Sequence, residues 1–218
     1  RAFAFYLKET EKIVVGYDAR VSSPVLKRSF IEGITNEGVN VWDIGLVTVD
    51  MVYFASGYFH LPAAMITASH NPREYNGFKL MRKDADEIGL DSGLDDIKKI
   101  ILEKNWREIS DDSGKDVGLK QGAFIKEDIG ADFVNHVLSF IDLESIRPAR
   151  VAIDASNGAV GPILAKILKK LPVEYTPLYF DPDGDFPHHE PNPAVESNIR
   201  DLIAEVRKGH YHFGCAFA

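Results

Sequence analysis

Short apolar runs alternate with segments of helical spacing along the whole chain, and this alternation restricts the fold more than any other feature. Strand-like runs occur at 13–16, 39–44, 62–66, 78–81, 150–154, 173–180 and 212–217. Helical patterns lie between them, including 23–35, 49–59, 126–141 and 195–208. Such alternation is typical of α/β proteins. We therefore expect two three-layer α/β/α domains with mixed, largely parallel sheets.

A change in composition divides the two expected domains. Residues 105–121 are mostly polar, and the run 111–116 at their centre reads Asp-Asp-Ser-Gly-Lys-Asp. Polar stretches of this kind between periodic segments are typical of connections. We predict a first domain over 1–115 and a second over 122–218.

Composition narrows the classes of partner. The chain has 33 acidic and 25 basic residues, a formal net charge of −8, and no basic block. Nucleic-acid binding needs a cationic face, so no nucleic-acid partner is expected. No apolar run approaches the ~18 residues of a membrane span.

The single cysteine, Cys215, allows no internal disulfide and fits a reducing, cytoplasmic location. No oligomeric state follows from these properties.

The two ends of the sequence suggest a piece of a longer protein. Arg1 is not an initiator residue, and the sequence stops at Ala218, directly after an apolar strand-like run. Domains rarely finish without a cap or tail at such a point. We expect further chain on both sides.

The stretch 64–72 begins as a buried strand and ends as a polar loop. The apolar run passes into Thr-Ala-Ser-His-Asn-Pro, and the Asn-Pro pair forces a turn. An apolar strand returns at 78–81. This arrangement places Ser69 and His70 at the mouth of a loop, with Lys79 on the returning strand. A nucleophile, a possible acid or base and a cation are thus expected at one rim.

Two interpretations of Ser69 and His70 remain open on these residues alone. They fit ordinary turn and cap positions. They also fit a phosphate-binding loop, in which His70, Asn71 and Lys79 donate to phosphate oxygens. A hydrolase triad is not indicated, because the residues are adjacent and no Gly-x-Ser-x-Gly elbow is present.

Two further loops follow the ends of expected strands, where α/β sheets bind ligands. Asp18 and Arg20 form either a local ion pair that fixes the loop or an arginine at the active rim. The loop 154–158 resembles a phosphate-binding turn but lacks the spaced glycines of a nucleotide motif, so a structural role is favoured.

The loop 181–193 does not match a metal site. A calcium loop beginning at Asp181 would need glycine at its sixth position, where Phe186 stands, and glutamate at its twelfth, where Asn192 stands. The run 188–190, His-His-Glu, has potential ligands, but three consecutive residues rarely chelate one ion. We assign no metal to this loop.

Three motifs together resemble one protein family. Residues 67–72 (Thr-Ala-Ser-His-Asn-Pro) with 75–79 (Tyr-Asn-Gly-Phe-Lys) resemble the active-serine signature of the α-D-phosphohexomutases, closest to the phosphomannomutase/phosphoglucomutase branch. Residues 16–20 resemble the family's Gly-x-Asp-x-Arg, and 184–193 resemble its second-domain signature. The resemblance covers essentially the whole chain.

The resemblance implies an isomerase that moves phosphate between C1 and C6 of a hexose phosphate. Its ligands would be hexose 1-phosphate, hexose 6-phosphate and a hexose bisphosphate. Ser69 would carry the phosphate as phosphoserine, with His70 and Lys79 as further catalytic residues. Arg20, Asn71 and Lys79 would bind substrate, and Arg20 would steady either the loop or the phosphate.

The resemblance also implies Mg²⁺ and a shortened second domain. The family holds its ion with an Asp-Gly-Asp-x-Asp-Arg loop after a strand like 213–217, so the ligands other than the Ser69 phosphate are expected beyond Ala218. We therefore expect the 218-residue chain alone to be weak or inactive. Two alternatives stay open: a non-catalytic sugar-phosphate binding or interaction module on the same fold, and a phosphatase.

Overall fold

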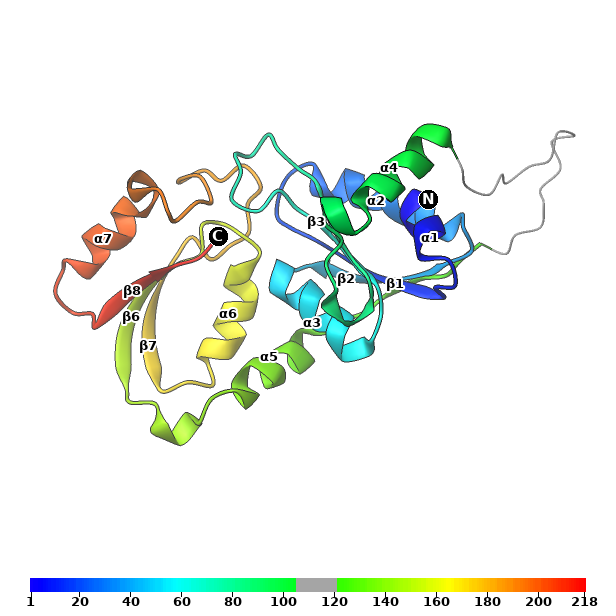
Figure 1. Cartoon of the computed structure of the whole chain (residues 1–218). Coiled ribbons are helices and arrows are strands. Elements are labelled where there is room, and N and C mark those ends of the chain that lie inside the picture. Colours follow the sequence, from blue (N-terminus) through cyan, green and yellow to red (C-terminus); the bar gives the residue numbers. More distant parts are fainter. Residues whose placement is uncertain (105–120) are drawn as a thin grey trace, which may run out of the picture.

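The computed structural model describes residues 1–104 and 121–218 and contains two β-sheets flanked by helices (Figure 1). The expected α/β architecture with mixed, largely parallel sheets is confirmed. The polar stretch 105–121 lies, apart from Gln121, outside the described residues. The division into 1–115 and 122–218 stays a prediction.

The first sheet has five strands in the order β4-β3-β1-β2-β5. Only the β3–β4 pair is antiparallel among these neighbours, because β4 returns directly from the Ser69 loop. The strands are β1 (Lys12–Tyr17), β2 (Asn40–Leu46), β3 (Ala63–Ile66), β4 (Phe78–Met81) and β5 (Phe124–Lys126). The helices of this part are α1 (Ala2–Leu7), α2 (Ser23–Thr35), α3 (Val49–Phe59), α4 (Leu94–Glu103) and the 3₁₀ turns η1 (Lys83–Ala85) and η2 (Leu90–Ser92).

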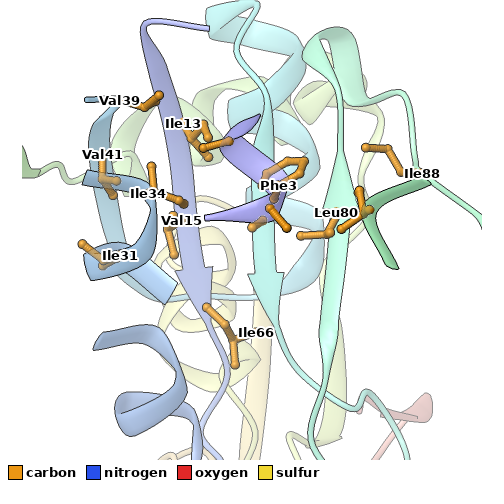
Figure 2. Close-up of a cluster of buried hydrophobic side chains, with 14 residues drawn as sticks. Phe3, Ile13, Val15, Ile31, Ile34, Val39, Val41, Ile66, Leu80 and Ile88 are labelled. Carbon is orange, nitrogen blue, oxygen red and sulfur yellow. The ribbon is translucent and has the colours of Figure 1, made fainter. Parts of the chain in front are cut away.

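Side-chain alternation along β1 creates the two apolar cores of the first sheet. Ile13 and Val15 point to one face and pack with residues of α1, α2 and α4 (Figure 2). Val14 points to the opposite face and packs with residues of α3. Successive strand residues alternate between faces, so a strand that is apolar throughout is covered on both sides.

The second sheet has three parallel strands in the order β7-β6-β8. They are β6 (Ala149–Asp154), β7 (Val173–Leu178) and β8 (Phe213–Ala216). Helix α6 (Val160–Leu168) covers one face through Leu168, which packs on Val151 and Ile153. Helix α7 (Arg200–Val206) contacts β6 and β8, and this part also contains the 3₁₀ turns η3 (Leu143–Ser145) and η4 (Glu196–Ile199). Among the described residues, no helix has the length and apolar character needed to cross a lipid bilayer.

Two of the predicted helices have different boundaries. The helix expected over 126–141 is α5 (Gly130–Ser139), because residues 124–126 pair with β2 as the edge strand β5 instead. Asp128 then accepts a hydrogen bond from the Gly130 amide at 2.8 Å at the turn into the helix. The helix expected over 195–208 is divided into η4 and α7.

Helix α5 connects the two sheets through apolar contacts. Its Phe133 and Val134 belong to the same core as Phe54 of α3 and Ile163 of α6. The Phe133 and Phe54 rings meet edge to face with centroids 5.6 Å apart. The second half of the chain therefore shares a core with the α3 face of the first sheet.

We predict that Phe133→Ala lowers the free energy of unfolding by about 3–5 kcal/mol, the usual cost of removing a buried phenylalanine side chain. Phe133 is 8% exposed. The matched control is Phe140→Ala at the end of α5, where the side chain is 74% exposed and about 0.5 kcal/mol is expected. Urea denaturation of both variants measures the difference. Equal losses would contradict the placement of α5 in the shared core.

Candidate active site

A cavity of about 120 Å³ lies where the strand ends of the two sheets meet. The first half of the chain contributes Thr48, Ser69 and Lys79 to its wall, and the second half contributes Gly158, Phe186 and Phe217. Most of these residues follow the carboxyl ends of strands, where open α/β sheets bind ligands. The sequence predicted the rim around Ser69, and the cavity contains it.

Ser69 has a left-handed backbone conformation. Its φ is +53°, and its side chain is exposed at the cavity. For a residue other than glycine this conformation costs on the order of 1–3 kcal/mol and is frequent at functional sites. The amide of Ser69 donates to the Thr67 hydroxyl at 2.8 Å. The surrounding loop therefore fixes Ser69 in a conformation that it would rarely adopt alone.

Arg20 is the central residue beneath this loop. The side chain is completely buried, and its guanidinium donates to Asp18 and to four backbone carbonyls of the loop. The acceptors are Asp18 Oδ2 (3.1 Å) and the carbonyls of Ser69 (2.5 Å), Asn71 (2.7 Å), Pro72 (2.6 Å) and Tyr75 (3.0 Å). A guanidinium has five N–H groups, so this set uses its full capacity.

These contacts bear on the two roles that the sequence left open for Arg20. A side chain with no exposed surface and every donor engaged has nothing left to offer a substrate. The structure therefore favours a loop-positioning role over the substrate-binding role that the sequence also allowed. The local ion pair between Arg20 and Asp18 is also present, and it is one of the contacts that hold the loop.

Asp18 connects the same loop to the start of α2. Its carboxylate accepts from the Arg20 amide at 3.1 Å, the Ser23 hydroxyl at 2.5 Å and the Thr67 hydroxyl at 2.8 Å. The cap residue of α2 is Ser22, and Ser23, the first residue of the helix, turns its hydroxyl to Asp18. The Thr67 hydroxyl is the link from Asp18 to the Ser69 amide.

Lys79 is the second residue of β4 and lies opposite Met65 of β3. Its side chain is half-buried and lines the cavity with Ser69. Within residues 1–104 and 121–218, its ammonium has no hydrogen-bond or ion-pair partner. A cation in this state at a cavity wall is suited to an anionic ligand.

His70 and Asn71 differ in how far they reach toward the cavity. His70 is exposed, and its Nδ1 lies 3.5 Å from Ser69 Oγ, at the long limit of a hydrogen bond. The Asn71 amide donates back to the Ala68 carbonyl at 2.7 Å and so helps to close the loop. The structure thus brings Ser69, His70 and Lys79 together and turns the Asn71 amide into the loop.

The sequence predicted the residues of the cavity wall only in part. Gly158 lies in a loop that the sequence placed at a strand end but assigned a structural role, while Phe217 and Asp50, in the first turn of α3, were assigned no role at the site. The motif at 184–193 was a signal for Phe186, but only as part of a family signature. Nothing in a local pattern shows which distant loop will lie against Ser69.

The side chains of the loop 154–158 make contacts of the structural kind that the sequence favoured, while Gly158 lines the cavity. Asp154 is completely buried and accepts from the Ser156 amide at 2.8 Å. The Asn157 amide donates to the Asp181 carbonyl at 2.8 Å. These side chains hold neighbouring loops in place.

The described residues do not form a metal site by themselves. Among them, no group of three or more His, Cys, Asp or Glu side chains is arranged to hold an ion. The carboxylate nearest Ser69 in the network, Asp18, already accepts from Arg20, Ser23 and Thr67. Mg²⁺ therefore stays a prediction.

Comparisons with known proteins agree on one family. The family models described as phosphoglucomutase/phosphomannomutase, alpha/beta/alpha domain I and domain II match residues 1–108 and 131–218. A phosphoglucomutase of Neisseria meningitidis serogroup B is 36% identical over 211 residues, covering 96% of this chain and 43% of that protein. A phosphomannomutase of Escherichia coli is 34% identical over 224 residues, covering 100% of this chain and 47% of that protein.

Solved structures show the same fold. A phosphoglucomutase/phosphomannomutase family protein of Burkholderia thailandensis has a TM-score of 0.83 at 29% identity, covering 98% of this chain and 46% of that chain. A structure from Thermus thermophilus has a TM-score of 0.82 at 21% identity, covers 99% of this chain and 48% of that chain, and supports the fold alone. The chain spans slightly less than half the length of the curated relatives described above, 43% and 47%.

We predict that Arg20→Met lowers the free energy of unfolding by about 3–5 kcal/mol, because it removes the guanidinium partner of the partly buried Asp18 carboxylate and the donor of four loop carbonyls. Arg28→Met on the exposed face of α2 is the matched control, with a change of about 0.5 kcal/mol or less. Chemical denaturation of both variants measures the effect. A loss for Arg20→Met no greater than for Arg28→Met would show that the guanidinium does not hold the loop.

Proposed function

This chain belongs to the phosphoglucomutase/phosphomannomutase family, and we propose that its protein is a phosphohexomutase acting through phosphoserine at Ser69. The substrates would be a hexose 1-phosphate and the matching 6-phosphate, with a hexose bisphosphate as intermediate. The observation that carries the proposal is the placement of Ser69. It lies in a strained conformation on a cavity that also contains Lys79, whose ammonium has no partner among the described residues.

The proposed reaction consists of two phosphoryl transfers. In the first, a sugar hydroxyl loses its proton to a base and forms a new bond to phosphorus, while the bond between phosphorus and Ser69 Oγ breaks and Ser69 Oγ takes up a proton. The products are a hexose bisphosphate and the free serine hydroxyl. After the sugar reorients, Ser69 Oγ gives its proton to a base and attacks the phosphate at the other carbon, and that sugar oxygen leaves and takes a proton. Atoms and charge balance, and the serine is phosphorylated again.

Lys79 and His70 have different roles in this proposal. Lys79 supplies positive charge at the cavity wall, which stabilises the phosphoryl oxygens as negative charge shifts during transfer. His70 lies 3.5 Å from Ser69 Oγ, and its exposed ring can exchange protons with solvent. Within the described part of this rim, it is the nearest side chain that can hold or return the proton of the hydroxyl.

In this proposal Arg20 acts on the reaction only by holding the Ser69 loop.

The size of the cavity is suited to a phosphoryl group. The volume of about 120 Å³ is smaller than the roughly 300–1,000 Å³ of typical small-molecule sites. A single phosphoryl group fits this space better than a whole hexose phosphate. Asn71, which the sequence placed among the substrate-binding residues, would contribute mainly by closing the loop.

Mg²⁺, if bound, would offset charge on the phosphate carried by Ser69. Because the described residues hold no cluster of metal-ligating side chains, no step above depends on the ion. We also propose that the 218-residue chain alone shows weak or no mutase turnover, because it spans less than half the length of its curated relatives. Wild-type turnover by that chain would contradict this part of the proposal.

We predict that incubation with a hexose 1,6-bisphosphate adds one phosphate to the full-length protein, and that peptide mapping places it on Ser69. Ser69→Ala removes both the phosphate and the mutase turnover, whereas Ser139→Ala on the exposed surface of α5 leaves both unchanged. Intact mass and a coupled mutase assay give the two measurements. Absence of phosphate on Ser69 would favour the non-catalytic module, and free phosphate without isomerised sugar would favour the phosphatase.

We also predict that Lys79→Met slows phosphoryl transfer by about 10²–10³-fold, the usual effect of removing one group that stabilises transition-state charge. The control is Lys83→Met in the exposed turn η1, which should transfer at the wild-type rate. Rapid-quench measurement of Ser69 phosphorylation reports the rate. Equal rates in the two variants would remove Lys79 from the mechanism.

A further inference from the structure

The loop 181–193 of the second half of the chain reaches across to the Arg20 segment of the first half. In Figure 1 this orange loop lies beside the teal loop that contains Ser69. Gly184 forms an isolated parallel bridge with Arg20, and Arg73 of the Ser69 loop lies 3.8 Å from Asp185. The Arg73–Asp185 pair is exposed and contributes little to stability. The backbone bridge between Gly184 and Arg20 is therefore the more important contact between the two loops.

Gly184 fits against Arg20 only because it lacks a side chain. A Cβ at this position would lie 2.3 Å from the Ala19 carbonyl oxygen and 2.6 Å from the Val21 nitrogen. Both neighbours are backbone atoms, so neither can turn aside. Glycine allows such close backbone approach, and any other residue forces the two segments apart.

Phe186 adds a second contact to Arg20. Its ring centre lies 5.5 Å from the guanidinium carbon of Arg20, within the range of a cation–π contact. The same ring lines the cavity with Ser69. The loop thus covers Arg20, and Arg20 holds the carbonyls of the Ser69 loop.

The far end of the loop is anchored on the second sheet by His189. Its Nε2 lies 3.0 Å from Asp154 Oδ2, and its Nδ1 lies 2.8 Å from the Glu190 carbonyl oxygen. Each ring nitrogen therefore faces an oxygen that can accept a hydrogen bond. The Asp154 side chain is completely buried and that of His189 is 8% exposed, so the pair is shielded from water.

Tyr179 supports the same anchor. Its ring stacks on His188 with centroids 3.8 Å apart and meets His189 edge-on at 5.5 Å. Its hydroxyl donates to Asp201 at 2.5 Å. Burial, together with this hydrogen bond, raises the pKa of Tyr179 to about 12, so the phenol stays neutral near pH 7.

We propose that loop 181–193 is an interdomain clasp that positions Ser69, with Gly184 and Phe186 pressing on Arg20 and His189 fixing the clasp to Asp154. The clasp residues are positioning residues, because they act on Ser69 through Arg20. The catalytic consequence rests on the proposed function, but the mechanical part does not. Movement of the second sheet relative to the first would loosen the Ser69 loop.

Hydrogen exchange tests the mechanical part on the full-length protein. Gly184→Ala should speed amide exchange in residues 67–77 by roughly 5- to 30-fold, as expected for loss of a local contact. Gly57→Ala in α3 is the matched control, because a Cβ there meets nothing within 4 Å. Unchanged exchange in 67–77 would overturn the proposal.

His189 variants keep the test decisive if Gly184→Ala does not fold. His189→Ala should loosen both 181–193 and 67–77, whereas His189→Gln, whose amide can still donate to Asp154, should restore much of the protection. The exposed His210→Ala is the control. In the double variant, the increase in exchange should be smaller than the two single-variant increases taken together, because Gly184→Ala and His189→Ala open the same clasp. Fully additive effects, or loosening of 181–193 alone, would contradict the proposal.

Kinetics separate this inference from the proposed function. A mispositioned Ser69 should lower kcat on the order of 10²-fold and leave KM for the hexose phosphate unchanged. A general loss of folding would instead lower the amount of active protein, while the folded fraction would keep the wild-type kcat. If the loop loosens as expected but the wild-type protein never phosphorylates Ser69, the proposed function fails and the clasp stands.

Discussion

The buried guanidinium of Arg20 is the interaction on which the site depends. Its donors are shared between Asp18 and four carbonyls of the Ser69 loop, so these hydrogen bonds fix the conformation of that loop. A carbonyl that loses water without gaining a donor is costly, and here one side chain supplies donors to all four carbonyls. Within the described residues, no buried side-chain polar atom lacks a partner. The strained φ of Ser69 is tolerated because the loop around it has so little freedom.

In each sheet, an aspartate at the end of the central strand accepts a hydrogen bond from the backbone amide two residues later. Asp18 follows β1 and accepts from the Arg20 amide, while Asp154 ends β6 and accepts from the Ser156 amide. Each aspartate also meets a second group, Arg20 in the first case and His189 in the second. One pair supports the Ser69 loop and the other supports the loop that reaches Arg20. The two networks meet at the Gly184 bridge, which makes the site a property of both halves of the chain.

Local patterns predicted the elements that local forces determine. Helix α3 begins and ends where the spacing of its apolar residues predicted, because Thr48 caps its first turn and His60 ends it in a left-handed conformation. Strand β5 was missed, since its three exposed residues are held by pairing with β2 and not by their own pattern. The rim of Ser69, His70 and Lys79 was predictable from a strand, a turn and a returning strand. The burial of Arg20 and the position of Phe186 were not, because both depend on contacts between residues far apart in sequence.

The central claim is that Arg20 positions Ser69 for phosphoryl transfer without touching the substrate. The most direct test is the rate at which a hexose bisphosphate phosphorylates Ser69 in the Arg20→Lys variant of the full-length protein. Lysine keeps the charge beside Asp18 but cannot donate in the planar fork that reaches four carbonyls. We expect the rate to fall on the order of 10²-fold, with KM for the bisphosphate unchanged. Phosphorylation at the wild-type rate, or a rise in KM alone, would contradict the account.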